Sequence, residues 1–560
     1  MMINAKETAN HWAHHPFFDR ETQTEALRIM EDEQRLLHCF GQELTFGTGG
    51  LRGILGVGTN RMNRYTVARA TQGLADFLRE KSLPVAIGYD TRHGSREFAE
   101  VTAGVLAENG LQAYLFDRPL PTPILSFAVR ELGCAVGVMI TASHNPAEYN
   151  GYKVYGSDGC QITDKAAQAV MERIERVEYE KTRWMGVDQA RQKQLLLDVP
   201  GWVYKAYLDH TLACRLFPQG DAAGIKVVYT ALNGTGTQPV SEALTAMPGV
   251  ILVQVSEQCL PDGNFPTCPQ PNPELPQALE LALKAARAEQ AELVLATDPD
   301  CDRVGVAVSK TNGEYHILTG NEVGLLIMDY VLGTRAKSGT LPENPLVIKT
   351  IVTSDLAFPI AQAHGAEVAE VLTGFKYIGE RIGELEQSGQ ESRYVFGFEE
   401  SCGYLAGTHV RDKDGVMACV LVTEMIQQYK ARGITLEQAL DKLYRTYGTL
   451  ESVLKTYEIT GALPMVTMDR TMKRLREKPP FFLAGDRITT LRDYLLGIQG
   501  LPPSNVLSYA TDTGAKAIIR PSGTEPKVKV YLFVRAANRP TAQDMLAQMV
   551  RETGEWLALE

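Results

Sequence analysis

Short runs of β-branched apolar residues recur along the chain, and each ends in small polar residues. Examples lie at 84–90, 135–141, 225–230, 293–297 and 345–350. Such runs are typical of strands buried on both faces of a parallel or mixed sheet. Helical patterns lie between them, at 66–80, 274–288 and 321–332. The alternation predicts α/β layers, with the chemistry at the carboxyl ends of the strands.

The length of the chain constrains the number of domains. Single hydrophobic cores stop growing at roughly 250–300 residues, so 560 residues predict several domains, about three to five. New α/β units are expected to start at Gly224 and near Gly320. The stretch 461–464 is interpreted as a linker. Strands expected around 517–520 and 527–534 predict a small α+β domain at the carboxyl end.

The composition excludes several classes of function. A net charge of -11 argues against general nucleic-acid binding, and an anionic substrate would need a local basic pocket. The nine cysteines include no Cys-x-x-Cys pair, which favours reduced thiols over disulfides or a thiolate zinc site. Residues 1–8 lack the apolar core of a signal peptide, and no apolar run reaches the length of a membrane helix. We therefore expect a cytoplasmic protein with no nucleic-acid or membrane partner.

Three carboxylates, Asp298, Asp300 and Asp302, stand at alternate positions, where the side chains of an extended loop project to one side. They repel each other unless a hard cation lies between them, and oxygen ligands suit magnesium or calcium. An EF-hand loop needs glycine and glutamate where Arg303 and Ser309 stand. A solvated acidic turn is the ordinary alternative. We interpret the loop as a site for a hard cation, magnesium or calcium, beside which Arg303 binds an anion.

Ser143 follows the strand expected at 135–141, so it is predicted to lie at a carboxyl end. Pro146 biases Asn145 away from helical conformations, which favours an exposed loop. The Gly-x-Ser-x-Gly motif of many hydrolases is absent around it. A lone serine here could equally be an ordinary turn residue. Lys153 follows closely and would suit proton transfer beside a bound cation.

Two later stretches have side chains that suit a phosphorylated sugar. Glu399 and Ser401 could accept and donate hydrogen bonds to adjacent hydroxyls, although turns often contain such residues. A candidate phosphate cradle, which is not a Walker loop, consists of Arg520, Ser522, Gly523 and Thr524. An ordinary Pro/Gly hairpin turn is the alternative for this second stretch.

Other candidates are weaker. Arg52, in the glycine-dense stretch 46–53, and Lys376 offer further anion contacts. His11 and His15 have the spacing of helical metal ligands, but Pro16 follows immediately. We interpret both as surface histidines.

Together, in this order, these motifs resemble those of the α-D-phosphohexomutase family. The family's marks are a phosphoserine loop, a three-aspartate magnesium loop, a sugar-binding Glu-x-Ser loop and a carboxyl-terminal phosphate loop. The resemblance covers 46–527, nearly the whole chain. Stretches 373–376 and 397–404 are similar to the longer phosphoglucomutase branch, which includes phosphopentomutase and glucose-1,6-bisphosphate synthase. Cys301 stands where glycine is common, and we expect its side chain to point away from the ion.

The resemblance implies a fold of four domains around a central cleft. Three would be similar α/β domains with mixed sheets, and the fourth a smaller α+β domain. The expected boundaries are 1–205 with the phosphoserine loop, 206–320 with the metal loop, 321–455 with the sugar loop, and 456–560 with the phosphate loop.

The resemblance also implies the roles of the residues. Ser143 would carry the phosphoryl group and, with Asp298, Asp300 and Asp302, hold one Mg²⁺ per chain. Lys153 and His144 would assist catalysis. The expected substrate-binding residues are Glu399, Ser401, Arg520, Ser522, Gly523, Thr524, Lys376, Arg303, Arg52 and Lys413.

The implied reaction interconverts hexose 1-phosphate and hexose 6-phosphate, with glucose expected as the sugar and a sugar 1,6-bisphosphate as intermediate and activator. Phosphomannomutase, phosphopentomutase and bisphosphate synthase activities stay open, because Glu399 and Ser401 would read hydroxyls that glucose and mannose share. A metal-dependent phosphatase and a non-catalytic sugar-phosphate sensor are the more distant alternatives. The sequence leaves the oligomeric state open.

Overall fold

The computed structural model describes residues 4–47, 49–79, 83–217, 223–459, 464–498, 500–522 and 527–557. The chain divides into two compact units, Met1–Val323 with Phe375–Arg432, and Gly324–Gly374 with Gly433–Glu560. The four domain boundaries expected from the sequence stay a prediction. Within the described ranges, no helix is both long enough and apolar enough to span a membrane.

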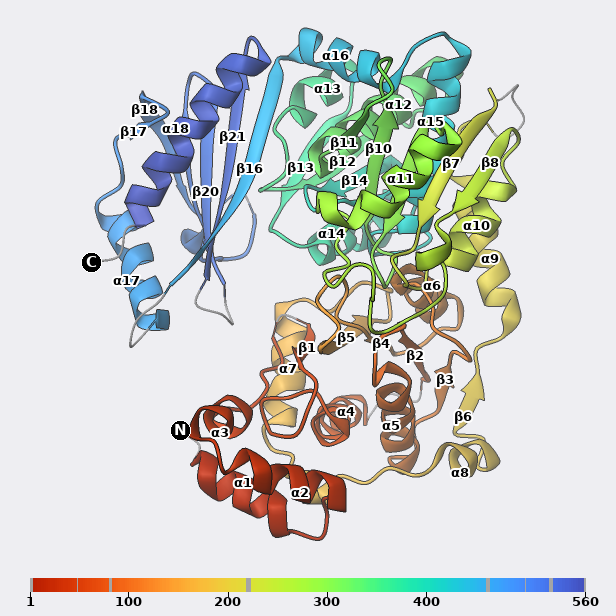
Figure 1. The fold of residues 1–560 in the computed structure, drawn as a ribbon, viewed down its shortest axis with the longest axis vertical. Helices are drawn as coiled ribbons and strands as arrows, with labels where there is room; N and C mark the ends of the chain where they lie inside the picture. Colours follow the sequence, from red (N-terminus) through yellow and green to blue (C-terminus); the bar gives the residue numbers. More distant parts are fainter. Residues whose placement is uncertain are drawn as a thin grey trace. The chain divides into compact units, whose positions relative to one another are not determined.

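The first sheet of unit 1 has the strand order β1-β5-β4-β2-β3-β6. These strands are β1 Gly50–Ile54, β2 Val85–Tyr89, β3 Ala113–Leu115, β4 Val136–Ile140, β5 Tyr149–Gly156 and β6 Leu196–Asp198. β4, β2, β3 and β6 run parallel, whereas β5 and β1 are antiparallel additions. Helices α4 (Arg64–Leu78) and α5 (Ser95–Glu108) cover one face and α6 (Thr122–Glu131) the other (Figure 1). The sheet is therefore mixed and covered on both faces, as predicted.

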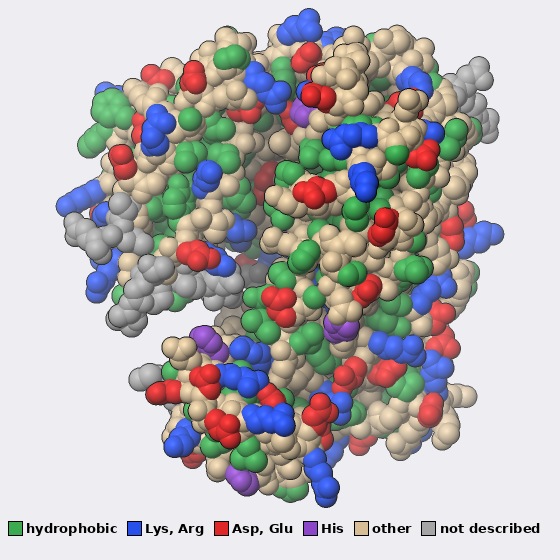
Figure 2. Space-filling model, in the orientation of Figure 1, with side chains coloured by type: hydrophobic (Ala, Val, Ile, Leu, Met, Phe, Trp, Pro, Cys, Tyr) green, Lys and Arg blue, Asp and Glu red, His purple; other side chains and the backbone are tan. Residues whose placement is uncertain are grey.

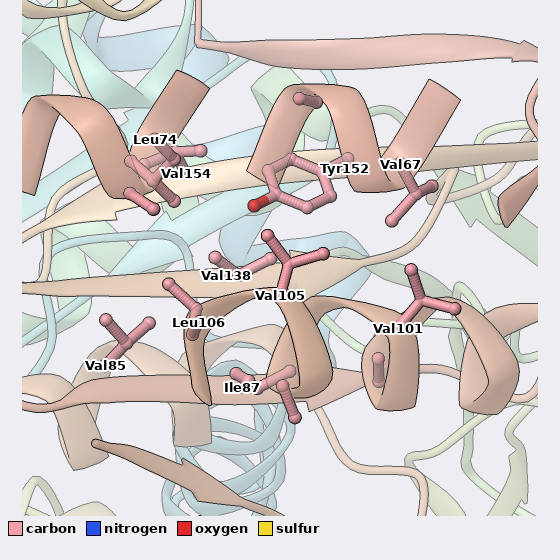
Figure 3. Close-up of a cluster of buried hydrophobic side chains, with 14 of the residues drawn as sticks. Val67, Leu74, Val85, Ile87, Val101, Val105, Leu106, Val138, Tyr152 and Val154 are labelled. Carbon is pink, nitrogen blue, oxygen red and sulfur yellow. The ribbon is translucent and has the colours of Figure 1, made fainter. Parts of the chain in front are cut away.

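The core of this region lies between the sheet and the pair α4 and α5. Val67 and Leu74 from α4 and Val105 from α5 point toward Val138 and Tyr152 of the sheet (Figure 3). All five residues of β2 and of β4 are buried, which explains their continuous apolar sequence. Helix α7 (Asp164–Ile174) packs closely on α4, because Gly73 leaves room for Ile174.

Three amino-terminal helices form a separate core. They are α1 (Ala5–His14), α2 (Arg20–Ile29) and α3 (Glu33–Phe40), and each begins with an Asn or Asp side chain that caps a backbone N–H. Trp12 lies at the centre of this core, stacked on Phe18 at 4.3 Å between ring centroids. Tyr179, from the short helix η1 (Tyr179–Lys181), joins it from much later in the chain.

The second sheet of unit 1 has the order β11-β10-β9-β7-β8. Its strands are β7 Ile225–Thr230, β8 Val250–Gln254, β9 Leu293–Thr297, β10 Val304–Ser309 and β11 Tyr315–Leu318. β8, β7 and β9 are parallel, and β9 turns into antiparallel β10 through 298–303. The predicted strands on both sides of the aspartates are thus confirmed.

Unit 1 contains further helices and strands outside these two sheets. They are α8 Val187–Gln192, α9 Gly201–Ala213, α10 Thr237–Thr245, η2 Ser256–Gln258, η3 Pro276–Leu279, α11 Glu280–Glu289, α14 Phe375–Gln387, η4 Glu391–Arg393, β14 Tyr394–Glu399, β15 Gly403–Leu405 and α15 Gly415–Ala431. Strands β14 and β15 form an antiparallel pair whose turn contains Ser401. Helix α15 is buried along most of its length.

Unit 2 contains an α/β part and a carboxyl-terminal α+β part. The α/β part has α13 Ala357–Ala363 between parallel strands β12 Leu346–Thr350 and β13 Glu367–Val371, and α12 (Gly320–Ser338) crosses into it from unit 1. The α+β part has an antiparallel sheet of order β16-β21-β20-β19-β18-β17. The helices and strands of this α+β part are α16 Leu436–Tyr447, β16 Thr449–Glu458, α17 Pro464–Glu477, β17 Phe482–Leu483, β18 Asp486–Asp493, η5 Tyr494–Leu496, β19 Leu507–Thr511, β20 Ala515–Pro521, β21 Lys527–Ala536 and α18 Arg539–Leu557.

The five apolar runs of the sequence are β2, β4, β7, β9 and β12, so the α/β prediction is confirmed. The small α+β region at the carboxyl end is confirmed as well. Of the expected linker at 461–464, residues 461–463 lie outside the described part, and Pro464 begins α17. Acidic and basic side chains are interspersed on the face shown in Figure 2.

Candidate active site at the carboxyl ends of β4 and β9

Ser143 lies two residues beyond Thr141, in the loop that follows β4. Its backbone has a φ of 53°, a left-handed conformation that is uncommon for a residue other than glycine. The Thr141 hydroxyl accepts a hydrogen bond from Ser143 N at 2.8 Å. Such strained positions cluster at functional sites, where the surrounding structure imposes them.

Arg92 supports this loop from inside the protein. Its guanidinium donates to the main-chain carbonyls of Ser143, Asn145, Pro146 and Tyr149. The side chain is fully buried and lies 3.3 Å from Asp90, which is buried as well. Neither residue was predicted from the sequence to belong to the site. A signal was present, because Asp90 directly follows the predicted strand β2 at a carboxyl end.

The aspartate loop folds tightly between β9 and β10. The Asp298 carboxylate accepts hydrogen bonds from Asp302 N at 3.1 Å and Arg303 N at 3.0 Å. Cys301 has a left-handed φ of 52°, which gives a reason why glycine would suit this position. Its side chain is buried, and a Cβ added to Gly236 would come within 2.9 Å of the sulfur.

The serine loop and the aspartate loop meet through one hydrogen bond. Ser143 Oγ donates to Asp298 at 2.8 Å, and Oγ is also 3.2 Å from His144 Nδ1. Burial and the neighbouring Asp302 and Asp300 raise the pKa of Asp298 well above its usual range. Burial, together with Arg303 and Arg52, lowers the pKa of His144 well below its usual value. His144 is therefore a neutral imidazole at pH 7.

Two lysines neutralise the other two aspartates. Lys153 Nζ donates to Asp300 at 2.9 Å and is 3.8 Å from Asp302, while Lys413 Nζ is 2.8 Å from Asp302. Burial alone would raise the pKa of Asp300, but Lys153 and Lys413 hold it below its usual value. Thr122 adds a hydroxyl donor to Asp300 at 3.1 Å, a contact that the sequence did not predict.

The carboxylates are suited to a hard divalent cation. One oxygen from each of Asp298, Asp300 and Asp302 can be chosen so that all three lie within 4.8 Å of one another, and all three residues are buried. Oδ1 of Asp300 and Oδ1 of Asp302 are buried and accept no hydrogen bond, while Oδ2 of Asp302 pairs with Lys413 at 2.8 Å. Buried acceptors of this kind are costly unless a cation or donor satisfies them. The three aspartates together could therefore bind a metal ion.

Glu399 and Arg303 lie close enough to these charges to interact with them. Glu399 ends β14 and is 5% exposed. Burial raises its pKa, although Lys413 and Arg303 act in the opposite direction and Ser401 forms a side-chain hydrogen bond with it. Arg303 forms an ion pair with Glu274, a partner that the sequence did not suggest.

Arg52 lies on β1 opposite Gly151 of β5. It is exposed and donates to the Asn145 side chain at 3.4 Å, beside the serine loop. Gly151 has no room for a side chain, because a Cβ there would be 2.5 Å from the Thr141 carbonyl oxygen. The glycine therefore permits β5 to lie close beside the carboxyl end of β4, which Ser143 follows.

Lys376 begins α14 with Phe375 and is 8% exposed. Its ammonium pairs with Asp164 at 2.9 Å and lies 4.8 Å from the centre of the Tyr377 ring. The sequence predicted an anion contact at Lys376, but it did not predict Asp164.

The candidate phosphate cradle belongs to unit 2. Arg520 lies on β20 opposite Lys529 of β21, and Ser522 N donates to the Lys527 carbonyl at 2.8 Å. This bond joins the residue that follows β20 to the first residue of β21. Gly523 and Thr524 lie outside the described residues.

Unit 1 thus assembles a buried serine hydroxyl, three clustered carboxylates and two ammonium groups. The hydroxyl comes from the β4 loop and the carboxylates from the β9 loop, which are more than 150 positions apart in sequence. Such an arrangement suits phosphoryl transfer, which needs charge stabilisation more than covalent chemistry from the protein.

Comparisons with known proteins agree with this chemistry. Sequence profiles of phosphoglucomutase/phosphomannomutase α/β/α domains I, II and III match residues 43–181, 205–313 and 319–447. The phosphoglucomutase of Staphylococcus aureus strain bovine RF122 / ET3-1 is 36% identical over 516 residues, covering 89% of this chain and 91% of its own. That of Staphylococcus haemolyticus is also 36% identical, over 529 residues that cover 92% of this chain and 94% of its own.

Solved structures share the fold. Pp63/parafusin, a phosphoglucomutase from Paramecium in its open form, has a TM-score of 0.69 at 17% identity and covers 92% of this chain and 94% of its own. A phosphoglucomutase/phosphomannomutase family protein from Burkholderia thailandensis has a TM-score of 0.67 at 19% identity, with coverage of 92% and 98%. By its three matched domains and its sequence identity to these relatives, the chain belongs to the phosphoglucomutase/phosphomannomutase family, the α-D-phosphohexomutases.

Proposed function

We propose that this chain is a phosphoglucomutase that interconverts α-glucose 1-phosphate and glucose 6-phosphate. The observation that carries the proposal is the 2.8 Å hydrogen bond from Ser143 Oγ to Asp298, which joins a candidate phosphoryl carrier to a candidate metal site. The name of the curated relatives, at 36% identity, supports glucose as the sugar.

We propose that Asp298, Asp300 and Asp302, together with an oxygen of the phosphorylated Ser143, hold one Mg²⁺. The three carboxylates supply only oxygen ligands, and the buried oxygens of Asp300 and Asp302 that accept no hydrogen bond favour a cation there. When bound, the ion would neutralise the phosphoryl oxygens and make the phosphorus more electrophilic.

In this proposal Ser143 carries the phosphoryl group in the active enzyme. Transfer to a sugar hydroxyl forms a new P–O bond and breaks the bond between phosphorus and Ser143 Oγ. Lys153 assists transfer of the proton from the attacking hydroxyl to Ser143 Oγ as the bond to phosphorus breaks, and its contacts with Asp300 and Asp302 hold it beside the carboxylates. Neutral His144, 3.2 Å from Oγ, helps to orient the serine. The sugar 1,6-bisphosphate then turns and returns its other phosphoryl group to Ser143.

Two sets of residues are proposed to bind the substrate. Glu399 and Ser401 are proposed to bind the sugar hydroxyls. Phosphate groups are assigned to Arg303, Arg52, Lys376, Lys413, Arg520, Ser522, Gly523 and Thr524. We also propose activation by a sugar bisphosphate and a cytoplasmic location. The proposed domains are 1–205, 206–320, 321–455 and 456–560.

A coupled assay tests the reaction and the sugar together. Glucose, mannose, glucosamine, ribose and deoxyribose 1-phosphates would be compared with and without glucose 1,6-bisphosphate. We expect the highest kcat/KM with glucose 1-phosphate, stimulation by the bisphosphate, and no net release of inorganic phosphate. Preference for another sugar would redirect the proposal to phosphomannomutase or phosphopentomutase activity. Stoichiometric phosphate release would instead indicate a phosphatase, and binding without turnover a sensor.

A further inference from the structure

A second group of metal-ligating side chains lies in the amino-terminal helical region. His11 is in α1, and His15 follows the last residue of this helix with extended backbone (φ -77°, ψ 130°). The helix therefore ends before Pro16, as the proline requires. The two imidazole rings nevertheless stay adjacent, with centroids 4.8 Å apart.

Glu180 completes the group from η1, 169 positions after His11. His11 Nε2 is 2.5 Å from the Glu180 carboxylate. One potential ligand atom from each of His11, His15 and Glu180 can be chosen so that all three lie within 4.8 Å of one another.

The aromatic core beneath these residues fixes their spacing. Trp12 and Tyr179 directly neighbour His11 and Glu180 in sequence, and their rings meet edge to face with centroids 5.2 Å apart. Both are buried, and Tyr179 also donates to Glu43 at 2.8 Å. Ligands that neighbour rigid, packed residues lose little conformational freedom when an ion binds.

We propose that His11, His15 and Glu180 bind one divalent transition-metal ion of the zinc class. Two imidazoles and a carboxylate are a ligand set that zinc accepts, whereas magnesium prefers sites made of oxygen alone. The site thus differs in chemistry from the aspartate cluster. It would fasten α1 to η1, two segments that otherwise meet through Trp12 and Tyr179.

Metal binding would change the hydrogen bonds of both histidines. Phe17 N donates to His15 Nδ1 at 3.2 Å, so the neutral ring carries its proton on Nε2. Coordination through Nε2 moves that proton to Nδ1 and releases the Phe17 N–H. His11 likewise gives up any proton that it shares with Glu180. An ordinary His11–Glu180 ion pair is the competing account, and it needs no metal.

The test is a calorimetric titration of the metal-stripped full chain with Zn²⁺ in excess Mg²⁺. The variants are His11→Gln, His15→Gln and, as matched control, His14→Gln, because His14 is exposed on the same helix and bonds the Asn10 carbonyl. We expect one Zn²⁺ per wild-type chain. The affinity should fall about tenfold or more in the first two variants and stay unchanged in the third.

Cobalt substitution gives a second measurement on the same proteins. Wild type and His14→Gln should show the visible absorption of nitrogen-coordinated Co²⁺, and the other two variants should lose it while keeping their circular dichroism. The proposal is overturned if wild type binds no Zn²⁺ under these conditions, or if all four proteins bind it alike. It also fails if Asp298→Asn, rather than the histidine variants, removes the binding.

Discussion

The guanidinium of Arg92 donates a hydrogen bond to the main-chain carbonyl of Ser143, 51 residues further along the chain. The same side chain bonds three other carbonyls of the serine loop and pairs with Asp90. A fully buried cation thus serves to hold the loop in which Ser143 adopts its left-handed conformation.

Arg92→Ala should therefore destabilise the protein strongly. The substitution leaves Asp90 buried without its partner and several loop carbonyls without a donor, so the free energy of unfolding should fall by about 3–5 kcal/mol. Arg96→Ala is the control, because Arg96 is exposed and pairs along its helix with Glu100; it should change stability by about 0.5 kcal/mol or less. Urea denaturation measures both. Equal effects of the two substitutions would contradict the supporting role of Arg92.

Gly415→Ala should displace the backbone of the aspartate loop. Gly415 is the first residue of α15, and a Cβ there would lie 2.5 Å from the Cys301 carbonyl oxygen. Because that carbonyl belongs to the loop of Asp300 and Asp302, we expect the affinity for Mg²⁺ to fall about tenfold or more. The dependence of mutase activity on Mg²⁺ concentration measures this.

The matched control is Gly201→Ala. Gly201 is likewise the first residue of a helix, α9, and a Cβ there meets nothing within 4 Å. This substitution should leave the Mg²⁺ dependence unchanged. If both alanine variants show the wild-type Mg²⁺ dependence, Gly415 does not position the loop.

The stability of the protein should depend on the charge of His409. Burial alone would lower the pKa of this imidazole, but the Asp414 carboxylate, 3.4 Å from Nε2, and the neighbouring Cys214 raise it to about 9. Because the folded pKa exceeds the ordinary value of 6.5, the stabilisation is fully present below pH 6.5 and is lost as the pH rises through 9. It amounts to about 3 kcal/mol.

Comparison of wild type with His409→Gln isolates this contribution. The difference between their free energies of unfolding should be largest at pH 6 and shrink steadily up to pH 9.5. His210→Gln, at the exposed ring that stacks on His409, serves as control and should show no such trend. A difference that stays constant across this range would show that His409 is not held as a cation.

The sequence was sufficient for the parts of the site that lie within one loop. Alternating aspartates and a serine after a buried strand are local patterns, and the structure places both at strand ends. Partners from distant segments could not be found in this way. Arg92 follows strand β2, and Thr122 begins helix α6. Only the folded protein brings Arg92 to Ser143 and Thr122 to Asp300.

Fold prediction was limited in the same way. The buried strands were recognisable because both of their faces are covered, which removes polar alternation from the sequence. Their order in the sheet depends on which helices pack together, and no single segment encodes that. The interpretation of His11 and His15 as separate surface histidines followed from Pro16, whereas the contact with Glu180 arises from a segment far away in the chain.

The central claim is that Ser143 carries the phosphoryl group, and direct detection of phosphoserine tests it. The protein would be incubated with Mg²⁺ and glucose 1,6-bisphosphate, digested, and analysed by mass spectrometry. Ser143→Ala would be compared with Ser157→Ala, at an exposed serine in the turn after β5. We expect phosphate on Ser143 in wild type and Ser157→Ala, its transfer to added glucose 1-phosphate, and neither phosphate nor turnover in Ser143→Ala. Phosphate on a different residue, or mutase turnover in Ser143→Ala, would contradict the claim.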